Sequence, residues 1–151
     1  MTDVRTAPYA ALVLRVALGV MFIAHALLKY YVFTLPGTVQ FFESIGLPGA
    51  LAYFTFYAEL IGGALILAGA WTRRVSAALI PVLIGATWVH AGNGWVFSAP
   101  NGGWEYPAFL TAAAIAQVLL GDGKFAVSAL FSRGAVIAAG APSLAVRKAL
   151  S

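Results

Sequence analysis

Long apolar runs separated by short polar segments dominate the chain. The runs cover about 9–29, 48–71, 75–91 and 104–120. The first is interrupted only by Arg15 and His25, and about 20 apolar residues are enough for a helix to cross the hydrocarbon core of a bilayer. The fourth reaches that length only when residues 104–106 belong to its first turn. The pattern predicts an all-α integral membrane protein, a bundle of four spanning helices.

The segments outside these runs are too polar or too short to cross a membrane. Residues 35–46 carry apolar side chains at the spacing of a short helix that lies in the membrane interface, between the first two spans. Residues 92–106 contain two glycine-rich turn signals and several aromatic residues, which predicts an ordered loop. We expect residues 1–124 to form one four-span domain, and residues 125–151 an interfacial or loosely packed tail.

The basic residues are distributed unevenly about the four predicted spans. One side of the membrane would hold Arg5, Arg73, Arg74, Lys124, Arg133, Arg147 and Lys148. The other side would hold only Lys29. Because cytoplasmic segments carry an excess of Lys and Arg, we expect both termini and the tail to lie in the cytoplasm.

Composition supports a membrane location and excludes several classes of protein. Hydrophobic residues make up 62% of the 151 residues and charged residues only 9%, whereas soluble domains have about 25% charged residues. The chain has no cysteine, so it cannot itself bind an iron–sulfur cluster or zinc through thiolates. Its nine Lys and Arg residues form no basic run, which argues against nucleic-acid binding.

Glu59 is the most informative polar residue within a predicted span. It lies about eleven residues, or ~16 Å, along the second span, which places it near the bilayer midplane. Gly62 and Gly63 follow it by three and four residues and share its face, so another helix can approach closely. A carboxyl group in this position is expected to be neutral, or to be paired with His25, Lys29 or Arg15.

The basic groups of the first span allow two interpretations each. Arg15 is expected to extend its guanidinium to the lipid headgroups, with an anchoring contact to another helix as the alternative. Lys29 is expected to do the same at the outer end, with an anion or a carboxylate partner as the alternative. His25 lies four residues before Lys29, hence on the same face. It either bonds a carbonyl of a neighbouring helix or belongs to a site.

Most of the polar groups within the spans gather in the predicted outer half of the membrane. An apolar cavity with two imidazoles and a carboxyl suits a quinone headgroup, because imidazoles can hydrogen-bond its carbonyls and the acid can exchange its protons. We therefore predict that Glu59, His25 and His90 carry the chemistry. The residues expected to contact the quinone are His25, His90, Lys29, Trp88, Asn93 and Glu105.

Haem and metal sites use the same residue types but receive less support. His25 and His90 could be the axial ligands of a b-type haem, but their predicted depths in the membrane differ. Two histidines with Glu59 could bind a metal ion, yet no closely spaced ligand motif is present. We predict no metal site and disfavour haem.

Several segments together resemble the DoxX family of small bacterial membrane proteins. They are Leu14–Lys29, Ala58–Gly69 with the following Thr72-Arg73-Arg74, Trp88–Phe97, and Asn101–Pro107. Where the family often has His-Gly in the first helix, this chain has His25-Ala26. The resemblance implies a four-helix bundle in the bacterial plasma membrane. It also implies association with oxidoreductase systems, such as quinone-linked sulfur or thiol oxidation and oxidative-stress complexes.

Two hypotheses for function follow. The first is a membrane subunit of an oxidoreductase assembly that contacts the quinone pool, with a partner protein supplying the redox centre because nothing in this chain carries an electron. The alternative is a non-catalytic structural or assembly subunit of a membrane complex, whose polar groups bond only to one another. Either hypothesis is compatible with a homo-oligomer.

Overall fold

The computed structural model describes residues 3–129, and within this range every regular element is helical. The five α-helices are α1 (Ala7–Leu27), α2 (Leu35–Ser44), α3 (Ala50–Ala68), α4 (Thr72–His90) and α5 (Glu105–Leu120). A π-helical segment, η1 (Leu28–Val32), continues α1, and a 3-10 turn, η2 (Ala91–Asn93), follows α4. The prediction of an all-α protein is confirmed for this part of the chain. The predicted tail lies outside the described residues from residue 130 onward.

The four predicted apolar runs coincide with α1, α3, α4 and α5. Three helical segments are long and apolar enough to cross a membrane: Ala7–Val32, Ala50–Ala68 and Thr72–Asn93. α5 is apolar but has only 16 residues, so the fourth span stays a prediction. The short helix expected near residues 35–46 is α2, and its position at a membrane interface also stays a prediction.

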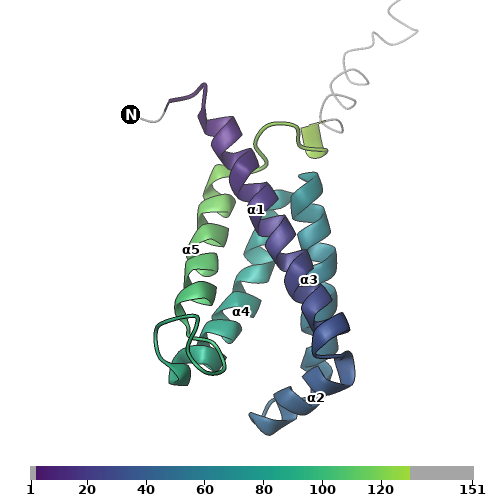
Figure 1. Cartoon of the computed structure of the whole chain (residues 1–151). Helices are drawn as coiled ribbons and strands as arrows, with labels where there is room; N and C mark the ends of the chain where they lie inside the picture. The colour runs from purple at the N-terminus through teal and green to yellow at the C-terminus, as the bar shows by residue number, and fades with distance from the viewer. Residues whose placement is uncertain (1–2, 130–151) are drawn as a thin grey trace, which may run out of the picture.

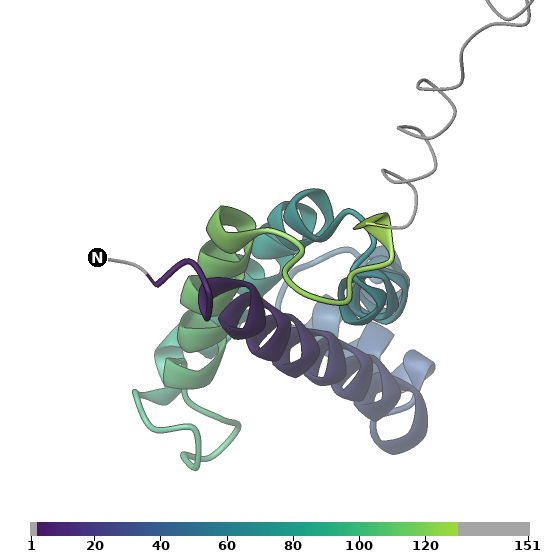
Figure 2. The ribbon, with the colours of Figure 1, turned by 90° about the horizontal axis from the view of Figure 1, so that it is seen from above.

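The long helices run up and down beside one another (Figure 1). α1 packs mainly on α3, and α4 packs mainly on α5, while contacts between α3 and α4 and between α1 and α5 are fewer. The start of α1, the α3–α4 turn and residues 121–129 meet at what we call the tail end (Figure 2). The opposite end, called the loop end, holds α2 and the loop between α4 and α5.

Glycines bring α1 and α3 into direct backbone contact. A Cβ atom added to Gly19 would lie 2.8 Å from Cβ and 2.9 Å from Cα of Leu67. A Cβ added to Gly63 would lie 2.9 Å from Cβ of Phe22. On the other side of α3, a Cβ at Gly62 would lie 2.8 Å from Leu79 of α4. The glycines that follow Glu59 therefore allow close packing on two sides of α3, as expected from the sequence.

The bundle has an apolar core and an apolar exterior. The core is formed by Leu18, Phe22, Ile66, Leu79, Leu83, Leu110 and Ala114. Large apolar side chains also cover the outside of each long helix, including Val13, Phe54, Ile84 and Leu119, which are 69%, 60%, 54% and 73% exposed. A surface of this kind suits contact with lipid, since soluble monomers rarely expose large contiguous apolar patches.

Arg15 is buried at the tail end, and only 2% of its surface is exposed. Its Nη1 donates to the backbone carbonyl of Asp122 (3.0 Å), and its Nη2 donates to that of Lys124 (3.2 Å). The expectation that Arg15 extends to the lipid headgroups is therefore wrong, because its guanidinium points into the protein. It anchors the segment that follows α5. The alternative interpretation, an anchoring contact, therefore holds, except that the partner is a loop and not another helix.

Asp122 ties that same segment to α4. Its Oδ1 accepts a hydrogen bond from the backbone N–H of Thr72 (2.9 Å), and its Oδ2 accepts one from the Ser128 hydroxyl (2.5 Å). The first N–H groups of a helix have no partner within the helix, so Asp122 completes the start of α4. Partial burial raises the pKa of Asp122. The hydrogen bonds from Ser128 and Thr72 and the charge of Arg15 together lower it by more than burial raises it, so the pKa lies below its ordinary value.

Asp122→Asn is expected to destabilise the protein by about 1 kcal/mol at neutral pH, since a charged acceptor is lost at the start of α4. Because the folded-state pKa of Asp122 is depressed, its contribution is present above the ordinary value of 3.8 and is lost as the pH falls through the folded-state pKa. Thermal unfolding in detergent as a function of pH measures this. A stability difference between wild type and Asp122→Asn that stays constant in acid would contradict it.

Candidate functional site

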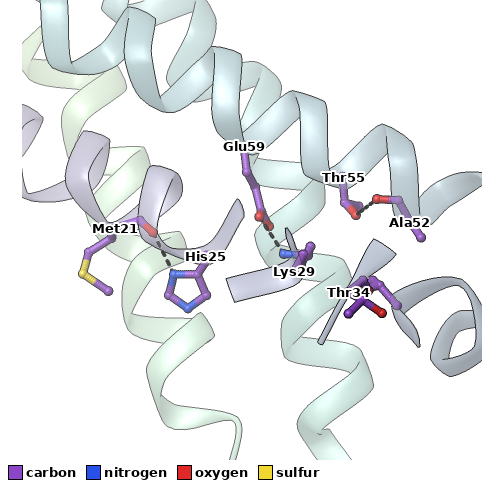
Figure 3. Close-up of polar contacts among 8 residues, drawn as sticks. Met21, His25, Lys29, Thr34, Ala52, Thr55 and Glu59 are labelled. Atoms are coloured by element: carbon purple, nitrogen blue, oxygen red, sulfur yellow. Dashed lines mark hydrogen bonds and ion pairs between the residues drawn. The ribbon is translucent and has the colours of Figure 1, made fainter. Parts of the chain in front are cut away.

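Lys29 and Glu59 form an ion pair inside the bundle near the loop end. Lys29 Nζ lies 2.6 Å from Glu59 Oε2, and the two side chains are only 17% and 9% exposed. Figure 3 shows the side chains pointing toward one another from η1 and α3. Of the three partners open to Glu59 from the sequence, the structure selects Lys29. The carboxylate partner was the alternative interpretation of Lys29, and the expectation that its ammonium extends to the headgroups is wrong.

His25 lies one turn before Lys29 on the same helix. Its Nδ1 is 2.7 Å from the backbone carbonyl oxygen of Met21 (Figure 3). Because a carbonyl oxygen can only accept, Nδ1 must carry the proton of this hydrogen bond. In a neutral imidazole, Nε2 is then left with its lone pair and can accept a hydrogen bond from a ligand or a proton from an acid.

Tyr106, in the first turn of α5, completes the group that we call the polar site: His25, Lys29, Glu59 and Tyr106. Its ring stacks on the His25 ring, with centroids 5.8 Å apart and planes at 20°. Its hydroxyl is buried and has no hydrogen-bond partner among the described residues. A buried hydroxyl without a partner costs free energy, so this donor is available for a ligand acceptor. The sequence analysis had not selected Tyr106 for the site.

The close contact of α1 with α3 positions the ion pair. Gly19 and Gly63 hold the two helices together in the middle of the bundle. Beyond this contact, α1 widens into η1, where the N–H of Phe33 bonds to the carbonyl of Leu28 five residues earlier (3.0 Å). Lys29 lies in this π-helical turn, a feature that is frequent at functional sites.

His90 and Asn93 belong to a separate group that holds the α4–α5 loop. His90 Nδ1 lies 3.0 Å from the carbonyl oxygen of Asn101 and 3.1 Å from that of Gly102. The Asn93 side-chain amide donates to the same two oxygens, at 3.1 Å and 2.9 Å. Both side chains therefore fix the loop after α4, which the sequence predicted to be ordered.

Glu105 and Trp88, the other residues expected to contact a quinone, also lie outside the polar site. Glu105 Oε1 accepts a hydrogen bond from the backbone N–H of Phe97 (2.9 Å) and thus holds the loop from the α5 side. Trp88 is 62% exposed, and no aromatic contact to it occurs within residues 3–129. A hollow of about 550 Å³ lies at the start of α5, lined by Trp95, Phe97, Glu105, Tyr106, Ala108 and Phe109.

The structure thus brings together three of the seven residues that the sequence selected. His25, Lys29 and Glu59 lie together, whereas no hydrogen bond, ion pair or ring contact in the described chain joins His90 or Asn93 to them. Within residues 3–129, no three His, Asp or Glu side chains gather in a position to bind a metal ion.

A protein-family model matches the sequence over most of these helices. The DoxX family model matches residues 10–92, which include most of α1, all of α2, α3 and α4, and three residues of the polar site, His25, Lys29 and Glu59. The chain belongs to the DoxX family. The resemblance noted from the sequence is therefore confirmed. The matched residues end before α5, so Tyr106 lies outside the matched part.

One relative of this DoxX protein is named "Putative oxidoreductase CatD" and comes from Bacillus subtilis (strain 168). The two sequences are 47% identical over 75 residues, which are 50% of this chain and 54% of the relative. The chain thus matches about half the length of this curated relative. No solved structure matches the chain.

The polar site of this DoxX protein combines three kinds of chemistry. The ion pair of Lys29 and Glu59 can hold charge within an apolar bundle without an uncompensated ion. His25 offers Nε2 as an acceptor of a hydrogen bond or a proton. Tyr106 offers a buried donor. Such a set can bind a small planar molecule with polar oxygens and exchange protons with it.

Proposed function

We propose that this DoxX protein is the membrane subunit of an oxidoreductase assembly, and that its polar site contacts a quinone. The family and the name of the Bacillus subtilis relative support the coarser part, association with oxidoreductase chemistry. The finer part rests on one observation. The Tyr106 ring stacks on His25, which precedes Lys29 of the ion pair by one turn, and its buried hydroxyl has no hydrogen-bond partner in residues 3–129. This hydroxyl is a donor for the carbonyl oxygen of a quinone.

The proposal includes a four-span topology in the bacterial plasma membrane, with both termini in the cytoplasm. α5 runs alongside α4 between the two ends of the bundle (Figure 1), so a bilayer that α4 crosses is crossed by α5 as well. Among the described basic residues, Arg5, Arg73, Arg74 and Lys124 belong to segments at the tail end, whereas Lys29 belongs to η1 at the loop end. This difference supports a cytoplasmic tail end, with α2 at the outer interface.

In this proposal the residues of the polar site bind the ring and handle protons. Tyr106 donates to one quinone oxygen. Neutral His25 accepts through Nε2, so it binds a hydroxyl of the hydroquinone, and it donates to a quinone oxygen once Nε2 has taken up a proton. Reduction of a quinone to a hydroquinone takes two electrons and two protons. Glu59 and His25 exchange the protons, and Lys29 holds the Glu59 carboxylate in place. The electrons come from a redox centre on a partner protein, since no side chain of this chain carries electrons in a quinone couple.

The first test measures bound quinone. The protein is purified in a mild detergent together with its partners and extracted with solvent, and the quinone is quantified by mass spectrometry. We expect near-stoichiometric quinone in the wild type and about thirtyfold weaker binding in the double variant Glu59→Gln, His25→Ala, since two contacts worth about 1 kcal/mol each are removed. Thr55→Val is the matched control, because Thr55 lies one turn from Glu59 but bonds only the Ala52 carbonyl of its own helix (3.0 Å, Figure 3).

Quinone at the background level of any membrane protein, equal in wild type and variants, would contradict the proposal. The variant His90→Ala tests whether His90 contributes to quinone binding separately from His25. Since His90 contacts loop carbonyls instead of the polar site, the loss of quinone in this variant would show that the loop also contributes, as the sequence predicted.

A second candidate function is that of a structural or assembly subunit. The observation that favours it is that Lys29 and Glu59 satisfy one another and that His25 bonds within its own helix. In that case the partner complex would co-purify equally with the wild type and with the Glu59→Gln, His25→Ala variant, and its turnover would be unchanged in both.

A further inference from the structure

An apolar groove runs along the outside of the bundle between α3 and α4. Its volume is about 680 Å³, and its walls include Tyr57, Ile61 and Leu65 from α3 and Val75 and Ala78 from α4. Tyr57 and Ile61 are 53% and 56% exposed. α3 and α4 contact one another much less than α1 contacts α3 or α4 contacts α5, so the groove is a gap in the packing of the four long helices.

An arginine closes the groove at the tail end. Arg74, in the first turn of α4, lines the groove together with Trp71, which is 57% exposed. Arg74 is exposed, and no carboxylate or other hydrogen-bond acceptor binds its guanidinium in residues 3–129. The groove therefore combines a long apolar wall with one unpaired cation, the Arg74 guanidinium, at the tail end of the bundle.

We propose that this groove binds one anionic glycerophospholipid. An acyl chain lies along Ile61, Leu65 and Val75, and the phosphate group lies against Arg74. Complementary charge carries the argument, since an apolar groove alone would accept any hydrocarbon, whereas an unpaired guanidinium at its end selects a negatively charged headgroup. The groove is distinct from the polar site, because Glu59 bonds to Lys29 of η1, whereas the groove lies between α3 and α4.

The described residues supply no anion to Arg74. Of the acidic residues at the tail end, Asp3 accepts a hydrogen bond from the backbone N–H of Arg5, and Asp122 accepts hydrogen bonds from Thr72 and Ser128. Residues 130–151 contain Arg133, Arg147 and Lys148 but no Asp or Glu side chain. Arg74 is therefore available to an external anion.

Native mass spectrometry of the full chain in detergent tests the proposal. The protein is titrated with phosphatidylglycerol and, separately, with phosphatidylcholine of the same acyl chains. We expect one phosphatidylglycerol to bind more tightly than phosphatidylcholine. Arg74→Gln is expected to lower the phosphatidylglycerol affinity about fivefold, since a cation near an anionic lipid contributes about 1 kcal/mol. Arg5→Gln is the control, because Arg5 is exposed at the same end but does not line the groove.

A second variant, Ala78→Trp, fills the groove and is expected to abolish the tight phosphatidylglycerol site. Should Ala78→Trp fail to fold, the comparison of Arg74→Gln with Arg5→Gln decides alone. Equal affinities for the two lipids in the wild type would overturn the proposal, as would equal effects of Arg74→Gln and Arg5→Gln. A lipid-free dimer that Ala78→Trp dissociates would also overturn it, since a second copy would then occupy the groove.

Discussion

Replacing Lys29 with methionine is expected to destabilise the bundle by about 3 kcal/mol, because Glu59 would be left in an apolar interior without its partner. The carboxylate would either stay charged without compensation or take up a proton, and both outcomes cost free energy. Denaturant unfolding in detergent micelles, followed by tryptophan fluorescence, measures the loss. Arg5→Met serves as the control, since it removes an exposed cation that lines no buried site.

The double variant Lys29→Met, Glu59→Gln distinguishes the stabilisation by the ion pair from a simple loss of packing. It replaces both charges, so it should lose less stability than the sum of the two single variants, with a coupling of about 1–3 kcal/mol. Strictly additive losses would mean that the two side chains do not interact in the folded protein.

Gly19→Ala is expected to lower stability by about 1–2 kcal/mol. The new methyl group would lie 2.8–2.9 Å from Leu67 Cβ, Cα and N, so α1 and α3 would have to separate or shift, and overpacking of this kind typically costs about 1–3 kcal/mol. The cost exceeds the gain of up to about 1 kcal/mol that alanine brings to a helix interior. The same unfolding measurement reports the difference.

Gly85→Ala is the matched control, because it is the same substitution within a long helix. A Cβ atom at Gly85 meets nothing within 4 Å, so the helix propensity of alanine should leave stability unchanged or raise it slightly. If both variants lost the same stability, the close contact at Gly19 would not be the cause.

The positions of the helices could be predicted from the sequence because they depend on the length of apolar runs. Each predicted run overlaps one helix of the bundle to within about three residues at each end, and residues 35–46 contain α2. The proximity of His25, Lys29 and Glu59 was also within reach, since two of them share a helix face and the glycines after Glu59 indicate close packing.

The rotation of each helix could not be predicted, since helices that are apolar on all sides carry little information about which side faces the core. Tyr106 was therefore not selected for the site, although its ring stacks on His25. The partner of Arg15 was missed for a related reason. Asp122 lies in Gly121-Asp122-Gly123, which indicates a turn but not the carbonyl groups that this turn presents to α1.

Arg15 also has a consequence for the order in which the protein matures. Ribosomes synthesise the chain from its N-terminus, and the carbonyl of Asp122 that receives the Arg15 guanidinium is made 107 residues later. Throughout that interval, the nascent first helix carries a guanidinium whose final hydrogen-bond acceptors have not yet been made. A translation product truncated before residue 121 would keep this guanidinium without these acceptors, so quality-control proteases that recognise unassembled membrane helices should degrade it faster than the full chain.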